Sequence, residues 1–237
     1  MPFDLPLRTS AGEQVLVRGT TDAERRFMAA VYRWMTFGLA LTALVAWTVA
    51  GSETALALIV GNRMVFFGLI IAELGLVFAI SGAAHRMSAQ TAGGLFLLYS
   101  ALNGATLSVV LLVYTGSSVA LAFVSTAATF GTMSVYGTVT RRDLSSWGSF
   151  LFMGLIGVVI ASVVNLFMRS SMMSFVISCA AVVVFTGLAA YDTQKLRALA
   201  RAGGGTASLA VNGALRLYLD FVNLFLALLR LLGGRRS

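Results

Sequence analysis

The sequence feature that most constrains the fold is a long run without charged side chains. From Met87 to Thr140 the chain contains no Asp, Glu, Lys or Arg. A helix that crosses a bilayer needs only about 20 apolar residues, so this run must contain two spans joined by a turn. Lipid offers no partner to open backbone N–H and C=O groups, and the alternating pattern of a transmembrane barrel is absent. The run therefore predicts a helical protein that crosses the membrane several times.

Composition agrees with an all-α integral membrane protein. Hydrophobic residues make up 58% of the chain and charged residues only 11%, whereas ordinary globular domains carry about 25% charged residues. The formal net charge is +8, but the arginines flank apolar segments, which is the pattern of topology signals and does not indicate nucleic-acid binding. Cys179 is the only cysteine, so no disulfide framework is expected.

Seven apolar segments predict seven transmembrane helices in one membrane domain, residues 29–232. A polar cytoplasmic N-terminal tail, 1–28, precedes this domain, and a short basic C-terminal tail, 233–237, follows it. Turn residues separate the segments, in the stretches "GSE", "HRMS", "YTGSS", "TRRDLSS", "MRSS" and "RAGGGTAS". The expected spans are 29–50, 63–84, 89–113, 118–138, 147–168, 172–193 and 208–231.

The distribution of Lys and Arg predicts how the chain is oriented. With the N-terminus inside, eleven basic residues fall in inside loops or the tail and five fall outside, which favours a cytoplasmic N-terminus and an outside C-terminus. The basic C-terminus argues mildly the other way. If the seventh segment were re-entrant, both ends would lie inside.

Asp220 stands inside the apolar stretch "LYLDFVNLFLALLR", about 18 Å into the last predicted helix. Charged residues within a span are costly and usually face a partner or a wet cavity. One explanation is a structural salt bridge with Arg216, one helical turn away. The other is an ion or proton site. Gly213, Arg216, Asp220, Asn223 and Ala227 share one stripe amid apolar faces, which favours a seventh helix at the centre of the bundle.

Two other acidic residues fall within spans. Asp192 lies in "GLAAYDTQKLRAL", where the sixth span is expected to meet the cytoplasm, and in isolation it fits a solvated pair with Lys195. Glu73 fits either a second cation ligand or a protonated hydrogen-bond donor. Asn103 and Asn165 are expected to form hydrogen bonds between helices.

The chain resembles the Bax inhibitor-one family, also called the transmembrane Bax inhibitor motif family, and is similar to its bacterial members. The ordered set of stretches is specific, although each piece alone is weak. The matching stretches are "VYRWMTFGLALTALVAW" (31–47), "AELGLVFAIS" (72–81), "SALNGATLSVVLLVYTGSSVALAF" (100–123), "SVYGTVTRRDLSSWGSFL" (134–151), "VVNLF" (163–167), "AAYDTQKL" (189–196) and "LYLDFVNLFLALLRLLG" (217–233).

The resemblance implies seven helices with the seventh surrounded by the other six, a pH-sensitive Ca²⁺ leak and a place in the bacterial inner membrane. The family's paired aspartates match Asp192 and Asp220, and an acidic residue in the second helix of many bacterial members matches Glu73. The basic residue that some members carry in that helix has its nearest counterpart in Arg86. Arg216 departs from the family pattern, and we expect it to pair with Asp220 or to reach towards Asp192.

Two carboxylates in one low-dielectric site resist being ionised together, so they share a proton and titrate in coupled steps. We therefore expect Asp192 and Asp220 to form a gate that is closed when the pair is protonated or holds a cation. Ca²⁺ takes about 6–8 oxygen ligands, so the pair would be a weak transit site completed by waters, Asn223 and backbone carbonyls. Ca²⁺ is then the transported ion, and no resident cofactor is expected.

Rival functions are an enzyme and a non-conducting regulator. His85 is the only histidine, which excludes a His-rich zinc site. Lys195 is the only lysine and ends the sixth span, which argues against retinal binding. We expect no enzymatic activity. A regulator would bind another membrane protein, such as a protease, through the N-terminal tail. The sequence leaves the oligomeric state open.

Overall fold

The structure, a computed structural model, describes residues 11–84 and 86–234, with the backbone alone for residues 11–21. Within these residues the chain forms eight α-helices and no strands. The helices are α1 (Ala11–Ala50), α2 (Glu53–Ile59), α3 (Arg63–Gly82), α4 (Ala89–Val113), α5 (Gly116–Val139), α6 (Ser145–Met168), α7 (Ser171–Arg201) and α8 (Ala207–Leu232).

Most helices begin where the sequence predicted a turn, because the turn stretches supply the capping residues. A Ser or Thr side chain accepts a hydrogen bond from the backbone N–H three residues later, which satisfies a donor that the first turn would otherwise leave open. Helix α2 was missed, although Ser52 gives it the same start signal, because its seven residues are too short for a span. The capping residues are Ser52, Ser88, Thr115, Ser170 and Thr206.

Six of the described helices are long and apolar enough to cross a membrane, namely α1 from Asp22 onward and α3 to α7. The prediction of an all-helical, multi-pass membrane protein is therefore confirmed. The count of seven spans is not confirmed. The predicted seventh span coincides with α8, which is not among the six, and α8 carries Asn212, Arg216, Asp220 and Asn223.

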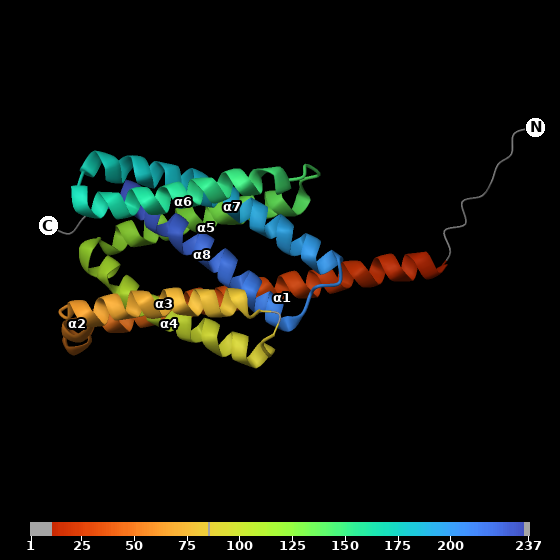
Figure 1. The fold of residues 1–237 in the computed structure, drawn as a ribbon, viewed down its shortest axis with the longest axis horizontal. Coiled ribbons are helices and arrows are strands. Elements are labelled where there is room, and N and C mark those ends of the chain that lie inside the picture. The colour runs from red at the N-terminus through yellow and green to blue at the C-terminus, as the bar shows by residue number, and fades with distance from the viewer. Residues whose placement is uncertain (1–10, 85, 235–237) are drawn as a thin grey trace, which may run out of the picture.

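Helix α8 runs diagonally between two groups of helices, α5 to α7 on one side and α1, α3 and α4 on the other (Figure 1). It packs against α1, α3, α4, α5 and α7, and sixteen of its 26 residues are buried. Helix α6 packs mainly against α7, and Leu151 is its only buried residue. The prediction that all six other spans surround the last helix is therefore not confirmed for α6.

Large apolar side chains cover the outer surface of the bundle. Phe67, Ile71 and Phe78 of α3 are exposed, as are Phe150 and Phe167 of α6. Such a surface is unfavourable in water and suits contact with lipid tails. The expected partnership with the lipid bilayer follows from this belt together with the six candidate spans.

Both predicted tails lie partly outside the described residues, which leave out 1–10, His85 and 235–237. Helix α1 begins at Ala11 and so continues back into the predicted tail, and its N-terminal part extends beyond the other helices (Figure 1). At the other end, the backbone N–H of Gly234 donates to the Ser118 hydroxyl at 2.9 Å. The chain after α8 is therefore fastened to the start of α5.

Helices α5 and α7 approach each other closely at Gly137. A side-chain carbon at this position would collide with the backbone carbonyl of Ala190. Backbone cannot yield as the tip of a side chain can, so only glycine fits here. Small residues at helix contacts are the usual device for close packing in membranes. Asp192 lies two residues beyond this contact on α7.

We predict that Gly137→Ala destabilises the bundle by about 1–3 kcal/mol, because the added methyl group must push α5 away from α7. Gly131→Ala on the same helix is the matched control, since a side-chain carbon there meets no atom within 4 Å. Thermal unfolding of the purified proteins in detergent measures the difference. Equal unfolding temperatures for the two variants would show that the contact is not tight.

Candidate functional site

The structure brings Asp192 and Asp220 together across the contact between α7 and α8. Their carboxyl groups lie within hydrogen-bonding reach of each other. Asp220 is only 5% exposed, and Asp192 is half-buried. Helix α7 continues nine residues past Asp192, to Arg201, so this aspartate does not sit at a helix end as the sequence suggested. The resemblance paired these two residues, and no spacing rule would have done so.

The aspartate pair has spare acceptor capacity. Oδ2 of Asp220 is buried and has no hydrogen-bond partner among the described residues. Two neighbouring carboxylates repel each other strongly when both are ionised. One shared proton replaces this repulsion with a hydrogen bond between α7 and α8. Within the described residues no group of three or more His, Cys, Asp or Glu side chains converges. A cation held by the two carboxyls would therefore need oxygens from water or backbone.

Arg216 is placed differently from the sequence expectation. Its Nε donates to Oδ1 of Asn212 at 3.3 Å, one turn before it on α8. It forms no ion pair within 4.0 Å with any acid among the described residues. Its head is exposed, yet its charge is close enough to act on both Asp192 and Asp220. Arg216 therefore influences the pair through space and leaves the two carboxyls to each other.

The remaining accessory candidates have other immediate partners. Asn223 is half-buried, and its side-chain N–H donates to the Leu219 carbonyl of its own helix at 2.8 Å. Arg86 is exposed in the turn after α3 and forms no ion pair with a described residue. Neither residue forms a hydrogen bond with the aspartate pair within the described part of the chain.

Glu73 belongs to a second polar cluster, between α3 and α4. One of its carboxyl oxygens accepts from the Thr106 hydroxyl, and the other accepts from the Asn103 amide at 3.2 Å. The sequence prediction that Asn103 hydrogen bonds between helices is confirmed. Asn165 does the same between α6 and α7, donating to the Ser174 hydroxyl at 2.7 Å. Glu73 thus lies apart from the aspartate pair.

Tyr218 joins this cluster to the buried helix α8. Its hydroxyl donates to Oδ1 of Asn103 at 3.0 Å and lies 2.6 Å from the Thr42 hydroxyl of α1. The side chain has no exposed surface. Residues 218 and 220 are about 200° apart around a helix, so Tyr218 and Asp220 occupy opposite faces of α8. Sequence reasoning missed Tyr218 because a tyrosine among leucines looks like ordinary core.

Asn212 was also missed. It is buried, donates to the Ile80 carbonyl of α3 at 3.3 Å and accepts from Arg216. Ser208, one turn earlier, donates to the Ala84 carbonyl at 2.7 Å. The signal was present, since Asn212 continues the polar stripe of Arg216 and Asp220 by one further turn of four residues.

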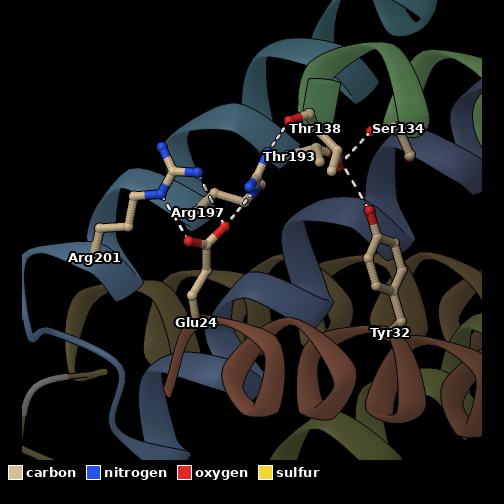
Figure 2. Close-up of polar contacts among 7 residues, drawn as sticks. All are labelled: Glu24, Tyr32, Ser134, Thr138, Thr193, Arg197 and Arg201. Carbon is tan, nitrogen blue, oxygen red and sulfur yellow. Dashed lines mark hydrogen bonds and ion pairs between the residues drawn. The ribbon is translucent and has the colours of Figure 1, made fainter. Parts of the chain in front are cut away.

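A third polar cluster ties α1 to α7. Glu24 of α1 points between Arg197 and Arg201 (Figure 2), with N···O distances of 2.5 and 2.7 Å. Arg197 also donates to the Thr138 carbonyl of α5. Two turns along α1, the Tyr32 hydroxyl lies 3.4 Å from that of Thr193, the neighbour of Asp192. Glu24 falls in the predicted polar tail, where nothing in the sequence indicated a partner.

We predict that Tyr218→Phe lowers the free energy of unfolding by about 1–2 kcal/mol, because Oδ1 of Asn103 loses its donor while it stays inside the bundle. Tyr136→Phe is the control, since the Tyr136 hydroxyl forms no hydrogen bond with a described residue and the side chain is 40% exposed. Unfolding temperatures in detergent measure both. A loss as large for the control would mean that the hydroxyl of Tyr218 carries no special role.

Comparison with known proteins places these helices in a family. The family model described as "Inhibitor of apoptosis-promoting Bax1" matches residues 24–237. Inner membrane protein YbhL of Escherichia coli is 49% identical over 89% of this chain and 92% of its own length. An uncharacterised protein of Borreliella burgdorferi is 45% identical over 97% and 98%. An uncharacterised membrane protein of Streptococcus pyogenes is 43% identical over 88% and 92%. The chain belongs to the Bax inhibitor-one family of multi-pass membrane proteins.

Proposed function

We propose that this protein is a pH-sensitive cation leak in the bacterial inner membrane, with Ca²⁺ as its cargo and Asp192 and Asp220 as its gate. The observation that carries the proposal is the apposition of the two carboxyls across the α7–α8 contact. A relative of the chain is an inner membrane protein, which supports the location. The cargo and the pH response are what the family resemblance implies.

The gate works through repulsion between like charges. With one shared proton, the carboxyl pair bonds α7 to α8, and the path is closed. When that proton is lost and no cation takes its place, two negative charges face each other in a poorly solvated place, and their repulsion drives the helices apart and opens the path. Flux therefore rises as pH rises through the titration of the pair. The positive charge of Arg216 acts on both carboxyls and that of Lys195 acts on Asp192, so both bases influence where that titration falls.

A cation that reached the pair would be held loosely. Asp192 and Asp220 supply at most four carboxyl oxygens, and Ca²⁺ takes about 6–8 oxygen ligands. Water and the carbonyls of α7 or α8 would complete the shell. A weak site suits passage, because a tightly bound ion leaves slowly.

We predict that Asp192→Asn and Asp220→Asn each remove most of the pH dependence of Ca²⁺ flux, and that the double variant adds little to either. An amide cannot lose its proton in this range, so the repulsion that opens the path is gone. Residues that act as a unit give such non-additive effects. The measurement is Ca²⁺ flux into liposomes that contain only the purified protein, across a pH series.

Asp22→Asn is the control for this experiment, because Asp22 is an exposed carboxylate of α1 without an ion pair among the described residues. Circular dichroism and thermal unfolding establish that each variant is folded. Folded single variants that keep wild-type flux at every pH would refute the gate. A wild-type protein that conducts no Ca²⁺ at any pH would refute the leak itself.

A second candidate function is a non-conducting regulator of another membrane protein. The observation in its favour is the N-terminal part of α1, which extends beyond the other helices as a free helical segment (Figure 1). Such a segment offers a surface for a partner without disturbing the bundle.

Two truncations separate the candidates, because Glu24 lies just inside the bundle. We predict that deleting residues 1–21 leaves both the unfolding temperature and Ca²⁺ flux unchanged, since the bonds from Glu24 to Arg197 and Arg201 are kept. Deleting residues 1–26 removes these bonds and costs about 1–2 kcal/mol of stability. If the shorter deletion abolishes binding to a partner membrane protein while stability stays intact, the regulator is favoured; a leak should survive it.

A further inference from the structure

A cleft of about 670 Å³ opens between the end of α5, the α5–α6 loop and the last turns of α7. It lies at the end of the bundle that carries the N-terminal half of α1 (Figure 1), the end predicted to face the cytoplasm. Five basic side chains line it, against one acidic side chain, Asp143. The basic residues are Arg141, Arg142, Lys195, Arg197 and Arg201.

The wall of the cleft is held in place by Gln194. Its Oε1 accepts from the backbone N–H of Leu144 at 2.8 Å, and its Nε2 donates to the Arg142 carbonyl at 2.9 Å. One side chain thus clamps both ends of the segment that carries Arg142 and Asp143 against α7. Binding sites gain affinity when the loop that carries the ligating groups is already ordered.

The charges in the cleft are only partly balanced from within. The Glu24 carboxylate forms ion pairs with both Arg197 and Arg201. Asp143 is turned to the start of α6, where its carboxylate accepts from the backbone N–H of Ser145 at 2.8 Å. Hydrogen bonding to Ser145 lowers the pKa of the Asp143 carboxyl, so Asp143 is ionised at neutral pH.

Three cations have no acidic partner within 4.0 Å among the described residues, and these are Arg141, Arg142 and Lys195. Lys195 lies near the Tyr191 ring, with Nζ 3.4 Å from the hydroxyl. Counting Glu24 and Asp143 against the five bases leaves an excess of three positive charges.

A topology signal alone does not require this arrangement. The preference for basic residues on the cytoplasmic side requires only that they lie near the ends of the spans on that side. Arg25 and Arg26, which are exposed on α1, satisfy it without lining a cleft. Here the bases converge on a hollow, alongside the hydroxyl of Tyr191. Guanidinium groups bind phosphate oxygens through two parallel hydrogen bonds, and an ammonium adds a point charge.

We propose that this cleft binds a phosphate-bearing anion at the membrane surface. The source of the phosphate is either the headgroup of an anionic lipid or a soluble phosphate compound. Basic pockets between transmembrane helices on the cytoplasmic side bind lipid headgroups of this chemistry in other proteins. The proposal does not depend on ion conduction by the aspartate pair.

Native mass spectrometry of the full-length protein in uncharged detergent tests the lipid source, with phosphatidylglycerol as the anionic probe and phosphatidylcholine as the neutral one. Titration with inorganic pyrophosphate tests the soluble source. The variant is Arg141→Gln with Arg142→Gln, and the control is Arg25→Gln with Arg26→Gln, which removes the same charge from exposed positions outside the cleft. Lys195→Gln is a second, independent cleft variant.

We expect at least one anionic probe to bind the double cleft variant roughly thirtyfold more weakly than wild type, because each of the two guanidinium groups that the cleft loses contributes a factor of about five to binding. The control should match wild type. Loss for phosphatidylglycerol assigns a lipid headgroup, and loss for pyrophosphate assigns a soluble ligand. If both probes bind Lys195→Gln and the folded double variant as they bind the control, the proposal is wrong and the arginines serve topology alone.

Discussion

The rest of the structure depends on the cost of burying polar groups on α8. An unpaired polar group inside a membrane protein costs several kcal/mol, so the polar side chains of this helix require partners on its neighbours. Ser208 and Asn212 bond to carbonyls at the end of α3. Tyr218 bonds to Asn103 of α4 and lies against Thr42 of α1. Asp220 faces Asp192 of α7. These contacts fix α8 between the two groups of helices.

Helix boundaries could be predicted from the sequence because hydropathy and capping are local properties. The span 89–113 coincides with α4, and the other segments end within a few residues of their helices, apart from α1 and α7. Helices α1 and α7 extend beyond their predicted spans because they continue through polar residues. Glu24 and Arg197 lie in these extensions and form an ion pair with each other. The partners of Tyr218 and Glu24 could not be predicted, since they depend on how each helix is rotated and on residues more than 100 positions away.

Arg216 lies near the aspartate pair, as expected, but its hydrogen-bond partner differs from the expected one. It is four residues after Asn212 and four before Asp220, and both neighbours can accept a hydrogen bond. In the structure the Nε–H of Arg216 donates to Asn212, and the Asn212 amide in turn donates to a carbonyl of α3. An exposed guanidinium keeps its hydration, so it gains little by entering the α7–α8 contact. The two aspartates are therefore left to share a proton with each other, and Arg216 acts on both only through its charge.

Glycine contacts between helices differ in what a side-chain carbon would meet. At Gly104 a side-chain carbon would lie 2.6 Å from the Thr42 backbone carbonyl of α1, and at Gly137 it would strike the backbone of α7. At these two points α1 approaches α4, and α5 approaches α7, as closely as their backbones allow. At Gly213 of α8 the nearest atom is instead the tip of the Leu196 side chain, at 2.7 Å. Side chains can yield where backbone cannot, so the contact between α7 and α8 at Gly213 is less rigidly set than the contacts at Gly104 and Gly137. The two aspartates thus lie at a helix contact that can adjust its spacing.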